Sequence, residues 1–402
     1  MTQHGSTGAD DMLPFTEEEY LERIENTKLR MMQFGLDVLL VSDPANMNYL
    51  TGYDGWSFYT PQVVVVALAQ DEPICIVRGI DLNGAKVTTF LDGRNLLGYP
   101  DDYVQNKRKH PMDFVAEILQ ARGLVRGVIG VEMDAYYFSA ASMAALEQNL
   151  PNATFKNAYT LVNWIRMIKS PQELQYMRQA ARILEKVMAT AIDAIEPGVR
   201  QCDAVAKIMA AQASGTPEFG GDYPSIVPML PSGVGTSTPH LTWSDQPFVS
   251  GEATILELAG CRLRYHCPQA RTVFLGKPPQ RLVDAAKVVV EGVEAVLSTI
   301  APGLTCEEVE KVWRDVIAKA GFVKESRCGY SVGLNYPPDW GEHTISIRPG
   351  DKTILHPNTA FHFMPGIWMN DWGVEISEPV LVTEDGCETF ADVPRKLIVK
   401  NI

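Results

Sequence analysis

The sequence predicts an α/β (α+β) fold with two domains: an N-terminal α/β domain at residues 1–163 and a C-terminal domain at 164–402, in which helices alternate with strands. Three observations lead to this prediction. The chain has 402 residues, which is more than one hydrophobic core usually supports. Short apolar runs alternate with helical segments in the first part of the chain. A pattern of helices followed by strands then occurs twice in the second part.

The N-terminal domain is predicted to begin with a helix and to continue as strands and helices. The segment TEEE at 16–19 is a capping-box sequence, which predicts a helix through about Phe34. Strands are expected where apolar residues occur together, and helices where apolar residues recur at helical spacing. The expected strands are 37–42, 61–69, 74–77 and 127–132, and further helices are expected near 111–122 and at 139–150.

The C-terminal domain is predicted to begin near a strong helix start. Ser170 is a typical N-cap residue, Pro171 occupies the first helical position, and Glu173 completes a capping box. Apolar residues at helical spacing follow. We therefore place the domain boundary shortly before this helix, between residues 163 and 164.

An internal repeat organises the rest of the C-terminal domain. The helical segment that ends in Ile195–Val199 and the one that ends in Ile300–Leu304 share the pattern Ile-x-Pro-Gly-aliphatic, and each is followed by another helical segment. Strand-rich stretches at 225–276 and 328–384 follow these helix pairs. Two similar halves would share a sheet, so a site is expected between the halves, on the inner face.

Composition excludes several classes of partner. The formal net charge of −14 disfavours nucleic acid and anionic membranes, and no basic patch offsets it. The longest apolar run, 63–69, is too short to span a bilayer, and the N-terminal sequence lacks a signal-peptide pattern, so a cytoplasmic location is expected. The seven cysteines contain no CxxC pair, which argues against a disulfide framework or a structural zinc site and indicates buried thiols.

Several segments together resemble the pita-bread family of creatinases, prolidases and methionine aminopeptidases. They are KSPQEL with MRQAARI, the two Ile-x-Pro-Gly sequences, TPHLTW with GEATILELAG, and EISEPVLVTEDG. The resemblance covers nearly the whole chain. It implies a creatinase-like N-terminal domain, a pseudo-twofold C-terminal pita-bread domain with helices over a curved antiparallel sheet, and a homodimer.

Metal-dependent members of this family carry five ligands, two Asp, one His and two Glu. Alignment on the Arg271–Thr272 pair places the two aspartate positions at Glu257 and Pro268. The motifs GYSVG, FMPG and EISEPVLV place the other three positions at Tyr330, Met364 and Ser377, with Glu375 and Glu378 close to the last of them. One carboxylate among Pro, Tyr, Met and Ser cannot hold a divalent ion. The resemblance therefore implies the metal-free branch of the family, and we expect neither a metal nor another cofactor.

Two residues are predicted to be catalytic. His240 matches the family's substrate-side histidine, and a neutral imidazole can transfer a proton near pH 7. The alternative interpretation is that His240 lies in a turn and only forms hydrogen bonds with backbone atoms. Glu257 lies within the apolar sequence ILELAG, where burial raises the pKa of a carboxyl. Its alternative is a structural salt bridge with Arg262, Arg264 or Arg271.

The resemblance also suggests substrate-binding residues. Arg348 aligns with an arginine that creatinase uses for its substrate carboxylate, and its alternative is a surface arginine. Aromatic side chains could hold an organic cation, although such side chains more often pack the core. The aromatic candidates are Tyr330, Tyr265, Trp243, Trp340, Trp368 and Trp372, together with Tyr53 and Phe58 from the N-terminal domain.

The absence of metal ligands favours a substrate that carries its own positive charge, since an amidinium carbon is already electrophilic. Within the family the chain most resembles the ectoine hydrolases, which open the cyclic amidine of ectoine to N-acetyl-2,4-diaminobutyrate. The expected partner is thus a small zwitterion. The alternatives are a creatinase-like amidino hydrolase, an Xaa-Pro dipeptidase and a non-catalytic binding protein.

Overall fold

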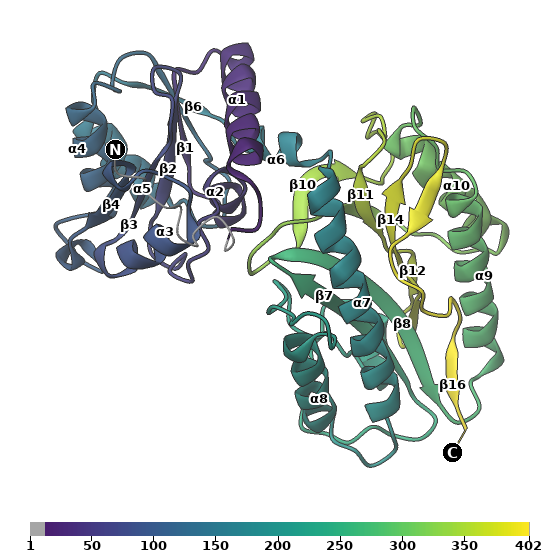
Figure 1. Ribbon diagram of the computed structural model, residues 1–402. Coiled ribbons are helices and arrows are strands. Elements are labelled where there is room, and N and C mark those ends of the chain that lie inside the picture. Colours follow the sequence, from purple (N-terminus) through teal and green to yellow (C-terminus); the bar gives the residue numbers. More distant parts are fainter. Residues whose placement is uncertain (1–12, 402) are drawn as a thin grey trace, which may run out of the picture. The chain divides into compact units, whose positions relative to one another are not determined.

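The structure is a computed structural model that describes residues 13–401. Helices and strands alternate along the chain, which confirms the predicted α/β class (Figure 1). The chain forms two compact units, which divide between Arg166 and Met167.

The first unit is built around a six-stranded mixed sheet. Its strand order is β4-β3-β2-β1-β5-β6, with β1 antiparallel to β2 and parallel to β5. The strands are β1 Val38–Val41, β2 Val63–Ala67, β3 Ile74–Arg78, β4 Leu96–Tyr99, β5 Val128–Val131 and β6 Thr154–Asn157. The α-helices are α1 Glu17–Phe34, α2 Pro44–Thr51, α3 Leu82–Thr88, α4 Pro111–Ala121, α5 Ala140–Asn149 and α6 Leu161–Arg166.

Local sequence signals account for most of this unit. The Thr16 hydroxyl accepts a hydrogen bond from the Glu19 backbone N–H and caps α1, which ends at Gly35 in a left-handed conformation. All four predicted strands form. The sequence did not predict α2, α3, α6, β4 or β6, because these elements are short and lack a long apolar run.

The second unit contains four long helices and three sheets. The helices are α7 Pro171–Ala194, α8 Gln201–Ser214, α9 Gln280–Leu297 and α10 Cys306–Lys319. The strands are β7 Ala253–Arg262, β8 Tyr265–Leu275, β9 Gly329–Val332, β10 Gly341–Ser346, β11 Ala360–Phe363, β12 Gly366–Trp368, β13 Gly373–Glu375, β14 Glu378–Val382, β15 Cys387–Thr389 and β16 Ile398–Lys400. The sheet orders are β10-β9-β11-β14-β15, β12-β13 and β16-β8-β7.

The helices confirm the predicted repeat. The reciprocal capping box of Ser170 and Glu173 begins α7 as expected. The two Ile-x-Pro-Gly segments join α7 to α8 and α9 to α10, and each pair packs together (Figure 1). Helix α7 lies on β7 and β8, whereas α9 packs against β12 and β13. The two helix pairs therefore cover different strands of one unit.

The strand-rich stretch predicted at 225–276 is only partly correct. Regular strands begin at Ala253, and the preceding residues form a loop with one short 3-10 helix, Gly233–Ser237. Four prolines interrupt this part of the chain, and each removes a backbone donor that a ladder would need.

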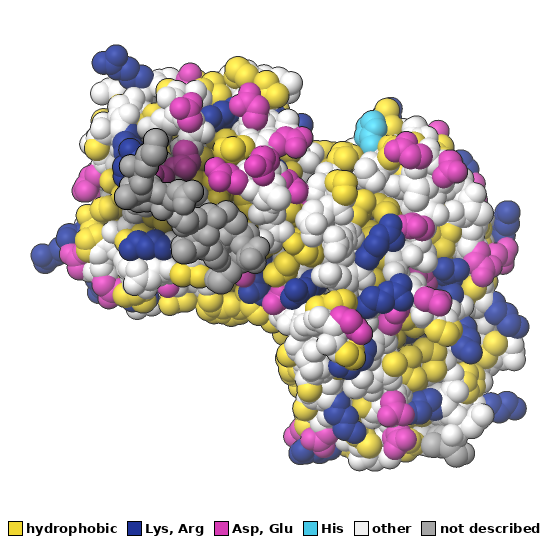
Figure 2. Space-filling model, viewed as in Figure 1, with side chains coloured by type: hydrophobic (Ala, Val, Ile, Leu, Met, Phe, Trp, Pro, Cys, Tyr) yellow, Lys and Arg dark blue, Asp and Glu magenta, His cyan; other side chains and the backbone are white. Residues whose placement is uncertain are grey.

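The surface and the cysteines agree with a globular protein. Acidic and basic side chains are interspersed over the face in Figure 2. Among residues 13–401, no helix has the length and apolarity needed to cross a membrane. All seven cysteines are free, and five are buried; Cys202 and Cys387 are only half-buried, which corrects the expectation of uniformly buried thiols.

Candidate active site

The direction of the Glu257 side chain follows from a glycine three residues later. A Cβ atom on Gly260 would lie 2.0 Å from the backbone oxygen of Ala180, so Gly260 lets α7 rest directly on β7. Alternate residues of a strand point to opposite faces. Glu257 therefore points away from α7, toward the inner face of the unit. Its side chain is 4% exposed.

The two strongest electrostatic neighbours of Glu257 are Glu375 and Lys324, which the sequence did not predict for the site. Burial, and then the charge of Glu375, raise the pKa of Glu257 well above its ordinary range, while the Lys324 ammonium lowers it. Burial also raises the pKa of Glu375 to about 7 and lowers the pKa of Lys324 to about 8. Two acids and one base thus share this part of the interior.

The salt bridges considered for Glu257 do not form within the described residues. Arg271 pairs instead with Glu378 at 2.7 Å. The Arg262 side chain donates to Gln179 and Gly220. The Arg264 guanidinium lies 3.9 Å from the centre of the Tyr223 ring. The alternative interpretation of Glu257 as the partner of one of these arginines is therefore wrong.

A hydrogen-bonded chain links two of the five residues that the sequence resemblance aligns with the family's metal ligands. The Tyr330 hydroxyl lies 3.2 Å from Nδ1 of His362, and Nε2 of His362 lies 2.6 Å from the Ser377 hydroxyl. The indole N–H of Trp340 donates to the Tyr330 hydroxyl at 2.7 Å, and the Ala270 N–H donates to Ser377 at 2.6 Å. Burial lowers the pKa of His362 to about 3, so the ring is neutral.

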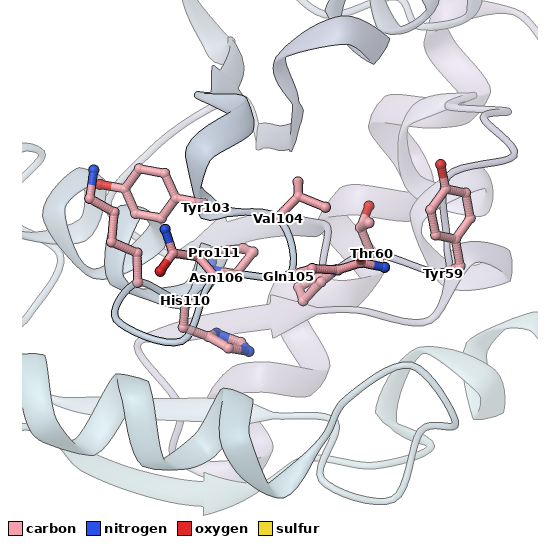
Figure 3. Close-up of a pocket in the computed structure, with 10 residues that line it drawn as sticks. Tyr59, Thr60, Tyr103, Val104, Gln105, Asn106, His110 and Pro111 are labelled. Atoms are coloured by element: carbon pink, nitrogen blue, oxygen red, sulfur yellow. The ribbon is translucent and has the colours of Figure 1, made fainter.

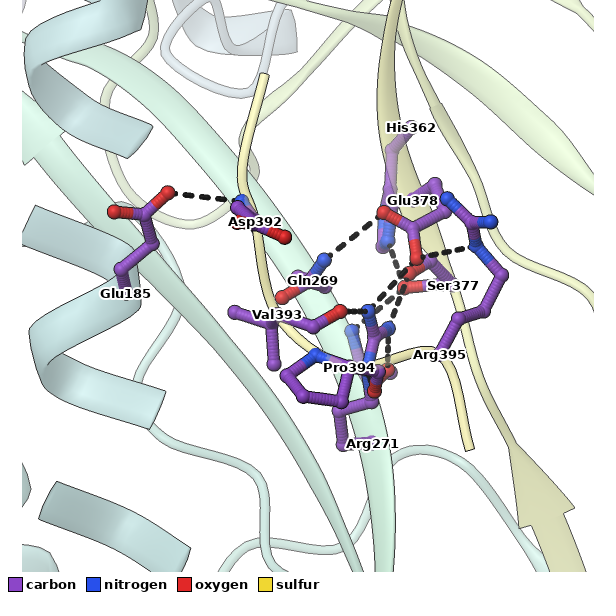
Figure 4. Close-up of polar contacts among 11 residues, drawn as sticks. Glu185, Gln269, Arg271, His362, Ser377, Glu378, Asp392, Val393, Pro394 and Arg395 are labelled. Atoms are coloured by element: carbon purple, nitrogen blue, oxygen red, sulfur yellow. Dashed lines mark hydrogen bonds and ion pairs between the residues drawn. The ribbon is translucent and has the colours of Figure 1, made fainter. Parts of the chain in front are cut away.

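The Arg271–Thr272 pair anchors the segment that carries Glu375 and Ser377. The Thr272 hydroxyl donates to the Glu375 backbone oxygen and accepts from the Glu375 N–H, both at 2.9 Å. The five N–H groups of Arg271 donate to Glu378 and to the backbone oxygens of Ala270, Ser377, Val393 and Pro394 (Figure 4). This buried network fixes the positions of the Glu375 and Ser377 side chains relative to β8.

The residues at the ligand positions do not fit a divalent metal. Pro268 and Met364 offer no hard donor, and the Tyr330 and Ser377 hydroxyls are engaged with His362. In residues 13–401, no group of three or more His, Cys, Asp or Glu side chains could hold a metal ion. Among the five residues aligned with metal ligands, Glu257 alone carries a carboxyl group.

Three predicted aromatics, Tyr330, Trp340 and Trp368, lie at this site, whereas Tyr265 faces away from it. Tyr330 is part of the hydrogen-bonded chain, and Trp340 is fully buried behind it. Trp368 lies beside Lys324, whose Nζ is 4.0 Å from the centre of its ring. Tyr265 faces α7 instead, because its hydroxyl donates to Glu173 at 2.9 Å. The prediction that Tyr265 lines the site beside Glu257 is therefore not supported.

Four further candidates lie away from this cluster or in exposed segments. His240 is exposed and Trp243 half-buried in the loop before β7. Arg348 is exposed after β10, and its Nε donates to the Ser346 hydroxyl at 2.9 Å. Trp372 lies under the Arg281 guanidinium and lines a separate pocket of about 200 Å³. In the part of the chain that the structure describes, no hydrogen bond, ion pair or ring contact connects Arg348 or Trp372 with Glu257.

Tyr53 and Phe58 lie in the first unit. Tyr53 is buried and its hydroxyl donates to Gln62 at 3.3 Å, while Phe58 packs against Trp56 and Tyr137. A pocket of about 210 Å³ in the same unit contains neither residue (Figure 3). It is lined by Tyr59, Thr60, Pro61, Tyr103, Val104, Gln105, Asn106, Lys109, His110 and Pro111.

Three site residues were missed from the sequence. His362 precedes Met364 by two residues, and Glu375 precedes Ser377 by two, so strand alternation could have placed both on the same face as a ligand position. Lys324 lies in the loop after α10, where no periodic pattern predicts the direction of a side chain.

Comparison with known proteins covers both units. The model for metallopeptidase family M24 matches residues 175–384, and the creatinase/prolidase N-terminal domain matches 23–168. The ectoine hydrolase of Halomonas elongata is 50% identical over 96% of this chain and 99% of its own length. The uncharacterized hydrolase/peptidase y4tM of Sinorhizobium fredii is 44% identical over 97% of this chain and 100% of its own length. The prolidase of Thermococcus sibiricus, 20% identical, has the same fold, with a TM-score of 0.81 over 95% of this chain and 99% of its own.

Proposed function

This chain belongs to metallopeptidase family M24, and on that basis we propose that it hydrolyses the cyclic amidine of ectoine to N-acetyl-2,4-diaminobutyrate without a metal ion. One observation carries the metal-free part of this assignment. A single buried carboxyl, Glu257, remains on the ligand frame, whereas Tyr330 and Ser377 at two other positions are bonded to a neutral histidine. The identity to the Halomonas elongata enzyme supports the choice of substrate.

The chemistry of the substrate explains how such a site can work. A peptide carbonyl needs a Lewis acid or an oxyanion hole to become electrophilic. An amidinium carbon already carries positive charge, so a carboxylate attracts the substrate and assists attack at the same time. Two divalent ions in this position would instead repel the cation.

In the proposed reaction, water adds to the amidine carbon, one ring C–N bond breaks, and the nitrogen leaves as a primary amine. Glu257 either attacks the carbon itself or removes a proton from the attacking water. His240 carries the proton to the departing nitrogen. The segment that precedes it is held next to β7 by the bridges Met229↔Glu257 and Ser232↔Thr254, and His240 itself is exposed eight residues after the second bridge.

Binding of the cation also prepares Glu257 for the reaction. The raised pKa keeps the Glu257 carboxyl protonated in the free protein well above pH 4.5. An amidinium placed against it favours the ionised form, because an opposite charge nearby stabilises a carboxylate. The substrate therefore helps to generate the carboxylate that acts on it.

A pH dependence follows from the same groups. Below its folded-state pKa, Glu257 is protonated and inactive, so kcat/KM for ectoine should fall on acidification through an apparent pKa well above 4.5. Glu375 and Asp339 raise this pKa and Lys324 lowers it. Glu375→Gln should therefore move the acid limb to lower pH. An acid limb near pH 4.5 in the wild type, or a shift to higher pH in the variant, would contradict this.

A substrate panel tests the function itself. The purified protein is incubated with ectoine, with creatine and with an Xaa-Pro dipeptide, and the products are identified by mass. We expect the ring-opened product from ectoine and no urea from creatine. Turnover of the dipeptide or creatine, but not of ectoine, would replace the proposal by one of the alternatives considered from the sequence.

The proposal includes a homodimer in the cytoplasm, as the family resemblance and the sequence suggest. Sedimentation of the purified protein should give twice the chain mass of 44.4 kDa. A monomer that retains full ectoine turnover would remove the dimer from the proposal.

A further inference from the structure

Three side chains beside Glu257 carry buried polar atoms that bond to nothing else in residues 13–401. They are the Nζ atom of Lys324, the indole nitrogen of Trp368 and both carboxyl oxygens of Glu375. Buried polar groups are nearly always hydrogen-bonded, because an unpaired one loses its hydration without replacement. Four unsatisfied atoms in one place therefore point to a missing ligand.

The geometry of β12 and β13 brings the three side chains to one face. Gly366 pairs with Glu375 and Trp368 pairs with Gly373 across this two-stranded ribbon. Paired residues of antiparallel strands point to the same side. A Cβ atom on Gly366 would lie 2.6 Å from the Trp368 ring, so the indole covers this glycine, opposite Glu375. The Lys324 ammonium lies on the indole, 4.0 Å from the ring centre.

The chemistry of these atoms is complementary to a zwitterion. Lys324 and the Trp368 indole offer only donors, and an ionised Glu375 offers only acceptors. A buried ammonium and a carboxylate that act on each other electrostatically would normally pair, yet no ion pair joins Lys324 to Glu375. A ligand that carries both an acceptor group and a donor group would satisfy all three.

We infer that Lys324 and the Trp368 indole N–H bind the carboxylate of the substrate, and that Glu375 accepts a hydrogen bond from its amidinium N–H. This inference rests on the proposed function and specifies the binding site for that same substrate. The amidinium then lies between Glu375 and Glu257, with its carbon facing Glu257. Lys324 replaces Arg348, the sequence-predicted carboxylate ligand, which is exposed and bonded to Ser346.

The test compares two substrates that differ only in the carboxylate. They are ectoine and the same cyclic amidine without its carboxyl group, and kcat/KM is measured for each. A hydrogen bond between charged groups corresponds to a factor of about 10 to 100 in affinity. We expect the wild-type protein to prefer ectoine by about this factor.

Loss of the Lys324 ammonium also raises the pKa of Glu257, so Lys324→Met is assayed above the acid limb of its own pH profile. There it should lower kcat/KM for ectoine about 10- to 100-fold, mainly through KM, and change kcat/KM for the amidine without carboxylate much less. Glu375→Gln should weaken the binding of both substrates, because both carry the amidinium. Lys324→Arg, which keeps the charge, should retain part of the preference for ectoine. Lys319→Met, at an exposed lysine of α10, is the matched control and should behave as the wild type.

Folding of the Lys324 variant is expected, since methionine has a similar length and removes an unpaired buried charge. Ectoine turnover by Lys324→Met at the wild-type KM, or an equal loss for both substrates, would overturn the inference while the proposed function stands. Absence of ectoine turnover by the wild-type protein would overturn the proposed function, and the inference with it.

Discussion

Replacing Glu257 by glutamine should reduce ectoine turnover by about 10³-fold or more, because the only carboxyl on the ligand frame can then neither attack the amidine carbon nor activate water. Gln keeps the size of the side chain and its hydrogen-bonding oxygen. The measurement is kcat for ectoine in Glu257→Gln, together with ectoine binding by calorimetry. Binding should persist, since Glu375 and Lys324 remain.

Stability separates loss of chemistry from loss of folding in this variant. The wild-type carboxyl is buried and has a raised pKa, so a neutral amide should fold at least as well at pH 7 and above. Glu252→Gln, at an exposed residue just before β7, is a suitable control with expected wild-type turnover. Near-full turnover by a correctly folded Glu257→Gln protein would eliminate Glu257 as the catalytic group.

The largest expected effect on stability comes from Arg271. Arg271→Met should lower the free energy of unfolding of the second unit by about 3–5 kcal/mol, because it leaves Glu378 buried with reduced compensation. Both side chains of the pair are 0–1% exposed, and Arg271 also bonds four backbone oxygens. Urea unfolding followed by circular dichroism measures the change.

Two further variants check that burial is the cause. Arg281→Met removes an exposed partner of Asp371 at 3.1 Å and should change stability by less than about 1 kcal/mol. Glu378→Gln added to Arg271→Met should restore part of the loss, since it removes a buried charge for which Arg395 is then the remaining ion-pair partner within residues 13–401. Equal effects of Arg271→Met and Arg281→Met would show that the buried network adds no special stability.

Features with a local cause could be predicted from the sequence. Ser170, Pro171 and Glu173 determine the start of α7 through contacts within one helical turn. The Ile-x-Pro-Gly segments similarly determine where two helices end. The apolar run around Glu257 predicts that this residue is buried, and the structure confirms the burial.

Features that depend on distant contacts could not be predicted in this way. The turn between β7 and β8 consists of Leu263 and Arg264, both with positive φ, instead of the Asn-Gly or Asp-Gly sequence typical of a two-residue hairpin. The strand register, and so the face that Tyr265 occupies, has no local signal. Lys324 reaches the site from an irregular loop and is recognised only by its position over Trp368.

The central claim is that one carboxylate replaces the family's two metal ions. The most direct test is to strip the protein of metal with a chelator, incubate it with ectoine in metal-free buffer, and detect the ring-opened product by mass. We expect turnover equal to that of the untreated protein and no stimulation by added Mn²⁺, Co²⁺ or Zn²⁺. Loss of turnover on stripping, with recovery on addition of a divalent ion, would contradict the claim.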